Sequence, residues 1–234
     1  SEVQLFNKPP WGVDAPSVEW AAEAAAFGWL RDFRADGGQA AKKGARELVR
    51  SWVERCGEWQ PLAWRPDVLG RRVLAWCSHA DFILRGADPH FRQAFLTSLA
   101  RQGRHLGLAW TLAPSGAGTL SALAGLAAAH ACFDWQGRIN RAIPGLLEAE
   151  LRKQILGDGC HVSRNPSDHL ALLRDLIWLQ STLSAAEAPV PLVLVSAIEH
   201  MGPMLGFFRH GDGALALFHG SAEENRALTT ETLA

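Results

Sequence analysis

The 234-residue sequence contains no tyrosine, only two methionines and only four cysteines, and its charges almost balance. Because the formal net charge is −1 at pH 7, bulk charge predicts neither a nucleic-acid partner nor attachment to a membrane surface. No apolar run approaches the length that crosses a bilayer. A hydrophobic fraction of 48% and a charged fraction of 20% are then typical of a globular protein with a sizeable core.

The cysteines lie far apart and form no CxxC pair, which is unlike a disulfide framework or a closed zinc site. We therefore predict buried thiols on apolar faces, with no metal and no cofactor. The four cysteines are Cys56, Cys77, Cys132 and Cys160. A metal site built from Cys160, His161, Asp168 and His169 is the alternative, but their spacing matches no closed zinc pattern.

The first residues, SEVQLFNKPPW, contain neither a basic n-region nor an apolar h-region. The sequence therefore predicts no targeting signal in this chain. Since a signal could have been removed, both the periplasm and the cytoplasm stay open as compartments.

The sequence contains ten tryptophans, although it contains no tyrosine. Tryptophan-rich surfaces can mark carbohydrate clefts, because an indole ring stacks on the face of a sugar. Tryptophan is also a large core residue, and for any single tryptophan the core is our first expectation.

Apolar residues recur at helical spacing along most of the chain. Glycines end several of these segments, and Asp88–Pro89 has the sequence of an N-cap followed by a first turn. The expected helices cover about residues 17–35, 39–56, 66–85, 89–109, 119–130, 143–156, 167–183 and 192–205. Short connections favour antiparallel neighbours, and helix pairs recur at about 45 to 50 residues. The predicted fold class is all-α, with helical hairpins in an array or toroid.

The C-terminal part has a different pattern. Residues 207–218, FFRHGDGALALF, alternate in hydropathy around a GDG turn signal. This pattern predicts a hairpin or an edge strand.

The most polar loop runs from Asp158 to His169 and reads DGCHVSRNPSDH between two apolar segments. Asn165 and Pro166 have the sequence of an N-cap and a first helical turn. A polar loop between two helices is where an all-helical scaffold presents chemistry. The alternative is a capped helix–helix turn with ordinary polar residues.

Four segments carry a resemblance to a known family: LAWRPDVLGRRVLAW (62–76), RQGRHL around His105, DGCHVSRNP, and MGPMLGFFRHGDGALALFHG (201–220). On these segments the sequence, from about Trp11 to Gly220, resembles the helical N-terminal domain of the heparinase II/III-like family of bacterial polysaccharide lyases.

The resemblance implies an incomplete α/α toroid followed by a C-terminal β-sandwich, with a groove that binds an acidic polysaccharide or oligosaccharide. It implies a toroid domain over residues 1–206 and the start of a truncated sandwich, or a tail, over 207–234. The implied activity is cleavage of a uronate-containing glycan by β-elimination, with this chain alone inactive.

β-Elimination requires a neutralised carboxylate, a base for the C5 proton and an acid for the leaving oxygen. His161 and His169 are candidates for moving the proton, and Asn165 for hydrogen bonding to the carboxylate. Arg164 is a candidate for pairing with that carboxylate. The structural alternative makes Asn165 a helix cap and His169 a first-turn residue.

Further substrate-binding candidates occur in pairs. Trp64 and Arg65 precede a helix, where an indole and a guanidinium could hold an acidic sugar, or where they could form a packed hairpin tip. Arg104 and His105 come late in a helix and could instead compensate its dipole. Arg209 and His210 fall near the junction with the implied sandwich.

Two departures from the family pattern oppose catalysis. The lyases have an Asn-His pair before the helix that corresponds to residues 120–130, where this chain has Ala117 and Gly118. They also have a tyrosine near the place of Asp168, and this chain contains no tyrosine at all. A noncatalytic glycan-binding or scaffold domain of the same fold is therefore the alternative to a lyase.

Overall fold

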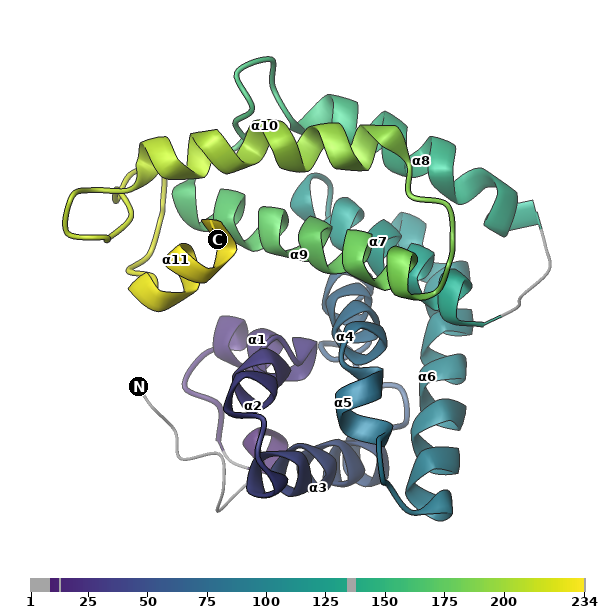
Figure 1. Cartoon of the computed structure of the whole chain (residues 1–234). Coiled ribbons are helices and arrows are strands. Elements are labelled where there is room, and N and C mark those ends of the chain that lie inside the picture. Colours follow the sequence, from purple (N-terminus) through teal and green to yellow (C-terminus); the bar gives the residue numbers. More distant parts are fainter. Residues whose placement is uncertain (1–8, 13, 134–137, 234) are drawn as a thin grey trace.

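A computed structural model describes residues 9–12, 14–133 and 138–233 of the chain (Figure 1). Over these residues the chain forms α-helices and two short 3-10 helices, with no strand. The α-helices are α1 (Val18–Ala26), α2 (Leu30–Asp36), α3 (Gln39–Cys56), α4 (Pro66–Ser78), α5 (Ala80–Leu84), α6 (Pro89–Ala109), α7 (Ala117–Cys132), α8 (Arg138–Gln154), α9 (Pro166–Ala185), α10 (Leu192–Phe208) and α11 (Arg226–Leu233). The 3-10 helices are η1 (Pro10–Gly12) and η2 (Trp110–Leu112). The prediction of an all-α fold is confirmed.

The helices follow one another around an open, curved array (Figure 1). Helices α1 to α3 lie at one end of the curve, α4 and α7 in its middle, and α8 to α10 at the other end. Helix α9 packs against α10 and also against α4 and α7, so it joins the last hairpin to the centre.

The predicted helix boundaries hold where a cap or a glycine determines them. Helix α3 begins and ends as predicted, and Asp88 caps α6 by accepting a hydrogen bond from the backbone N of Phe91 (2.8 Å). The prediction of one helix over 17–35 was wrong, because the chain breaks at Phe27, which has a left-handed φ of 61°. Phe27 is fully buried between the rings of Trp52 (5.9 Å) and Trp76 (5.4 Å), and this packing offsets the backbone strain.

The helix expected from Pro66 to the residue before Gly86 is also divided. It breaks at His79, where α4 ends and α5 begins. The buried His79 ring bonds through Nδ1 to the carbonyl oxygen of Ala75 (2.9 Å), within the last turn of α4. A side-chain bond of this kind gives the helix end a local partner.

Of the hairpin or edge strand predicted over 207–218, the described part of the chain forms a short hairpin-like turn but no strand. Phe207 and Phe208 form the end of α10, and beyond them Arg209 and Leu215 make one isolated antiparallel bridge. Hydrogen bonds from His210 N to Ala214 O (2.8 Å) and from Ala216 N to Phe208 O (2.9 Å) close this turn, but a single bridge is too short to form a strand. The sequence pattern also missed α11, which packs against α9 and α10.

Glycine contacts at the centre bring α4 and α7 unusually close. A Cβ atom on Gly70 would lie 2.6 Å from the Cα of Ala122, and one on Gly125 would lie 2.6 Å from the Cα of Gly70. Towards the start of both helices, a Cβ on Gly118 would lie 3.4 Å from the Cβ of Asp67. The two helices therefore run in the same direction with their backbones in contact.

Arg72 is a cation that is completely buried in the core. Its Nη1 donates to the carbonyl oxygens of Ala25 (2.9 Å) and Ala63 (2.8 Å), and its Nε donates to Gln102 Oε1 (2.7 Å). The guanidinium lies 4.2 Å from the centre of the Trp52 ring. Burial lowers the pKa of Arg72 to about 9, so the side chain stays protonated at neutral pH and joins four parts of the fold.

Several tryptophans belong to the core, and Trp11, Trp29, Trp110 and Trp178 are half-buried against it. Trp52, Trp64 and Trp76 are buried, whereas Trp59 is 64% exposed. None of the described helices combines the length and the apolar character that a bilayer crossing requires.

We predict that Gly70→Ala strongly destabilises the fold, because the added methyl group collides with the backbone of α7. The expected loss in unfolding free energy is on the order of 3 kcal/mol, measured by chemical denaturation. Gly145→Ala is the matched control, since no atom lies within 4 Å of the added Cβ on α8. It should leave stability unchanged or raise it by up to about 1 kcal/mol. Equal stability of the two variants would contradict the close contact.

Candidate functional site

The polar loop between α8 and α9 is a closed turn. Its backbone is held by hydrogen bonds from Leu156 N to Cys160 O (2.9 Å) and from Val162 N to Gln154 O (2.8 Å). Gly159 has a φ of 82°, and a Cβ there would lie 2.8 Å from the carbonyl carbon of His200 on α10. The loop therefore packs directly against α10.

His169 lies at the start of α9 and is completely buried. Its Nδ1 accepts a hydrogen bond from the backbone N of His161 (3.2 Å), and its Nε2 lies 2.9 Å from the carbonyl oxygen of Met201. These partners fit a neutral ring protonated on Nε2, and burial lowers the pKa of His169. The ring thus joins the loop, α9 and α10 and leaves neither nitrogen for a ligand.

His161 is 3% exposed and is also bonded at both ring nitrogens. Nε2 lies 2.9 Å from Gln154 Oε1, and Nδ1 lies 2.7 Å from Ser163 Oγ. Burial lowers the pKa of His161 as well. Gln154, which is 2% exposed at the end of α8, was missed by the sequence analysis because an isolated glutamine gives no motif.

Asn165 and Arg164 have local partners. The Asn165 Oδ1 accepts from the backbone N of Ser167 (2.8 Å) and of Asp168 (3.3 Å), which is the N-cap arrangement. Arg164 is exposed, has a φ of 56°, and pairs with Asp158 at 2.6 Å. The geometry thus gives Asn165 the role of a cap, while a substrate contact at Arg164 or Asn165 stays a prediction.

The C-terminal segment covers the start of α9. The hydroxyls of Ser167 and Ser221 are 3.0 Å apart, and the backbone N of Ala222 donates to Ser167 Oγ (3.1 Å). Next to this contact, a Cβ on Gly220 would lie 3.7 Å from Asn165 Nδ2. Residues far apart in the sequence therefore cover one side of the predicted catalytic loop.

The predicted substrate-binding residues are only partly brought together. Arg65 makes a bidentate ion pair with Asp67 at the start of α4, from Nε to Oδ1 (2.7 Å) and from Nη2 to Oδ2 (2.8 Å). Asp67 lies beside Gly118 of α7, and a Cβ on Gly116 would lie 4.0 Å from Gln154 Oε1, the partner of His161. Arg65 and His161 therefore lie at the same end of the array, where the starts of α4 and α7 meet the loop.

The remaining candidates lie elsewhere. Trp64 is 4% exposed, donates from Nε1 to the carbonyl oxygen of Cys56 (3.3 Å) and packs edge-on against His105 (5.0 Å). Arg104 is exposed on α6. Arg209 donates to Thr230 Oγ1 (3.3 Å), and His210 is exposed beside it.

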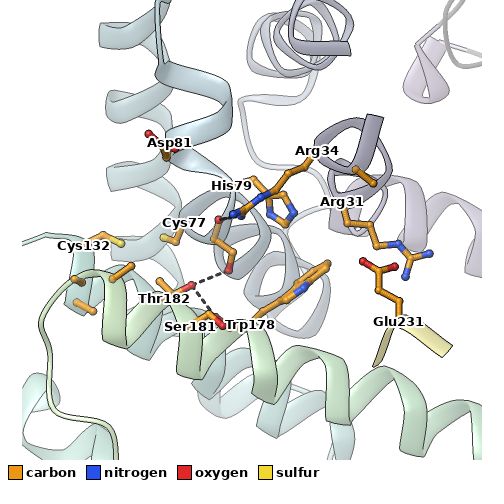
Figure 2. A pocket seen from close by; sticks show the side chains of 15 residues that line it. Arg31, Arg34, Cys77, His79, Asp81, Cys132, Trp178, Ser181, Thr182 and Glu231 are labelled. Carbon is orange, nitrogen blue, oxygen red and sulfur yellow. Dashed lines mark hydrogen bonds between the residues drawn. The ribbon is translucent and has the colours of Figure 1, made fainter. Parts of the chain in front are cut away.

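A groove of about 1010 Å³ lies at the opposite end of α4 and α7 (Figure 2). None of the ten predicted site residues lines it. Its walls come from α2, the α4–α5 junction, the end of α7, α9 and α11. The chemically distinctive lining residues are Arg31, Arg34, Cys77, His79, Asp81, Cys132, Trp178, Ser181, Thr182 and Glu231.

Trp178 is the aromatic surface of this groove. Its half-buried ring packs edge-on against His79 (5.2 Å), and the guanidinium carbon of Arg174 lies 5.3 Å from its centre. Burial lowers the pKa of His79 to about 4, so this histidine is neutral at pH 7. Thr182 is buried, and its Oγ1 donates to the carbonyl oxygen of Trp178 (2.8 Å) and lies 2.7 Å from Ser78 Oγ.

Guanidinium groups supply the groove with hydrogen-bond donors. Arg34 donates from Nη1 to the carbonyl oxygen of Ser78 (3.1 Å), while Asp81 is paired with Arg85 (2.7 Å). Arg31 Nη1 is buried and has no hydrogen-bond partner among the described residues, and the same holds for Nε of Arg174, which does not line the groove. Buried donors of this kind are expected to bind an acceptor.

A carboxylate–arginine network lies behind these donors. Arg71 pairs with Glu23 through Nη2 (3.1 Å) and approaches Asp175 through Nε (3.6 Å). Burial raises the pKa of Asp175, and the charge of Arg71 opposes that rise. Within the described ranges, no three His, Cys, Asp or Glu side chains gather into a possible metal site.

No family model matches the chain. FtsZ-localized protein C from Caulobacter vibrioides (strain NA1000 / CB15N) is 34% identical over 226 residues, which are 96% of this chain and 39% of that protein. The crystal structure of heparinase III superposes with a TM-score of 0.62 at 16% identity, covering 92% of this chain and 34% of that one. Heparan sulfate lyase HepC from Pedobacter heparinus gives 0.57 at 19% identity, covering 89% and 34%.

These comparisons show the fold. The chain has the helical, toroid-type architecture found in heparinase III, in agreement with the fold that the resemblance implied. It spans about two fifths of the curated relative and about a third of each lyase. At these identities the lyase structures carry no information on activity.

The lowered pKa of His169 predicts a loss of stability in acid. The unfolded chain binds a proton near pH 6.5, above the pKa of the folded state, so unfolding free energy falls as pH drops below about 6.5. His169→Gln keeps an acceptor and a donor but removes this titration. Between pH 7 and 5, the unfolding free energy of His169→Gln should change less with pH than that of the unmodified chain. The difference in slope should be up to about 1.4 kcal/mol per pH unit.

Leu173→Ala is the control, because it removes a buried, uncharged side chain from the same helix. It should lower stability at every pH and leave the pH dependence unchanged. If His169→Gln retains the full pH dependence of the unmodified chain, the ring is not the neutral group described above.

Proposed function

We propose that this chain is a noncatalytic binding domain built on the heparinase III helical fold, and that it binds an acidic saccharide in the groove beside Trp178. The observation that carries the noncatalytic assignment is the hydrogen bonding of His161 and His169 at both ring nitrogens. A general base must reach the proton that it removes. Two buried, bonded rings are poorly placed to do this.

The groove supports binding by its combination of groups. Trp178 offers an indole face, the exposed Ser181 offers a hydroxyl, and Arg31 and Arg34 offer guanidinium donors (Figure 2). Guanidinium groups recognise carboxylates and sulfates through paired hydrogen bonds. An acidic sugar stacked on Trp178 with its anionic group towards Arg31 or Arg34 fits this arrangement.

Cleavage of a uronate-containing glycan by β-elimination is the competing function. It would use His161, His169 and Asn165 in the roles that the family resemblance implies. The missing tyrosine, the Ala117–Gly118 sequence and the closed loop weigh against it. Opening of the loop and of the C-terminal segment over Ser167 would be required.

A second candidate function follows from the relative's name. We propose that the chain, as part of a longer protein, acts as a scaffold domain at sites occupied by FtsZ. The similarity of 34% over 96% of this chain to FtsZ-localized protein C supports this. A fluorescent fusion of the full-length protein should colocalise with labelled FtsZ, and a diffuse signal in dividing cells would oppose the proposal.

We predict that the full-length protein and this chain bind uronate-containing oligosaccharides without releasing an unsaturated product. Trp178→Ala should weaken binding about tenfold in calorimetry, because the stacking surface is lost. Arg34→Ala should also weaken binding. Arg152→Ala is the control, since Arg152 pairs with Glu148 on α8 and does not line the groove.

The catalytic alternative is tested in the same preparations by the ultraviolet absorbance of the elimination product. An absorbance increase that disappears in His161→Ala and His169→Ala would overturn the noncatalytic assignment. Binding that is insensitive to Trp178→Ala but lost in Arg164→Ala would move the saccharide from the groove to the loop.

A further inference from the structure

Cys77 and Cys132 face each other at the wall of the groove (Figure 2). Cys77 lies in the last turn of α4, and Cys132 is the last residue of α7. The two thiols are close enough for each to shift the pKa of the other. The pair does not rest on the saccharide proposal, since its geometry comes from α4 and α7 alone.

The glycine contact explains why these two residues meet. On α4, Cys77 follows Gly70 by seven residues. On α7, Cys132 follows Gly125, the other glycine of the close contact, by seven residues. Seven residues are about two helical turns, so both cysteines return to the face that carries their glycine. Because α4 and α7 run in the same direction, the two thiols arrive at the same level.

The two thiols differ in exposure. Cys77 is 7% exposed, and both its interaction with Cys132 and its burial raise its pKa. Cys132 is exposed, and its interaction with Cys77 lowers its pKa. The accessible sulfur is thus the one more readily converted to a thiolate, which is the reactive form of cysteine.

We propose that Cys77 and Cys132 are an oxidation site, at which a peroxide converts the paired thiols into a reversible intramolecular disulfide. The Cys132 thiolate attacks one peroxide oxygen, the O–O bond breaks, and the products are a sulfenic acid and, after protonation, one water. The Cys77 sulfur then attacks the sulfenic sulfur, an S–S bond forms and the S–O bond breaks. The hydroxide released takes the proton of Cys77 and leaves as a second water.

In the balanced reaction two thiols and one hydrogen peroxide give one disulfide and two waters. The two electrons lost by sulfur reduce the peroxide, and a dithiol reductant reverses the step. The other two cysteines are buried without a second thiol beside them in the described structure. Burial raises the pKa of both Cys56 and Cys160, which disfavours their reaction.

The disulfide would fasten the ends of α4 and α7 at the point where they line the groove. It would close a long loop that includes α5 and α6, which restricts the unfolded chain and stabilises the folded one. The oxidised protein should therefore resist denaturation better than the reduced protein.

The test is oxidation of the reduced, purified chain with one equivalent of hydrogen peroxide, followed by alkylation in denaturant and mass spectrometry. We expect loss of two alkylatable thiols per chain, a cross-linked peptide pair containing Cys77 and Cys132, and a higher melting temperature. A dithiol reductant should restore all four thiols. Intermolecular links, or a cross-link between any other cysteines, would overturn the proposal.

Single variants separate this site from general oxidation. In Cys77→Ser, peroxide should leave a sulfenic acid on Cys132 that a dimedone probe captures and that forms no cross-link. In Cys132→Ser, reaction with one equivalent should nearly cease, whereas Cys160→Ser should still form the disulfide. Persistence of sulfenic acid on Cys132 in the unmodified chain, with Cys77 still free, would mean that the two sulfurs do not meet.

Discussion

The backbone contact between Gly70 of α4 and Gly125 of α7 is the constraint on which the rest of the structure depends. Without side chains at these positions, the two helices touch and run in parallel through the middle of the array. Their starts then bring Asp67 to Gly118 beside the polar loop, and their ends bring Cys77 to Cys132 at the groove. One helix crossing therefore positions both regions of chemical interest.

The two ends of this helix pair have different character. At the starts, the histidines of the loop are enclosed and serve as hydrogen-bonding links between helices, as Gln154 and Met201 show. At the ends, Trp178 and the guanidinium groups line a groove of about 1010 Å³. A shared fold does not fix chemistry, so the proposal of recognition rather than proton transfer rests on these two arrangements and not on the fold.

Much of the fold could be predicted from the sequence, because helical periodicity and capping act locally. The bounds of α3 and the caps Asp88 and Asn165 are examples. The break at Phe27 could not be predicted, since the left-handed backbone depends on aromatic packing from distant helices. The groove was missed for the same reason: its lining comes from five parts of the chain, and the Cys77–Cys132 pair has no motif. The loop itself was found, but the burial of its histidines depends on α10.

The hydrogen bonds at all four ring nitrogens make His161 and His169 neutral structural links. Nitrogen-15 NMR of the imidazole rings in the folded chain tests this assignment directly, because ring-nitrogen shifts report both tautomer and protonation. We predict one neutral form for each ring, with the proton on Nε2, and no protonation until the pH lies below the usual histidine value of about 6.5. Titration of either ring near that value, or a ring proton exchanging freely with water, would contradict this assignment.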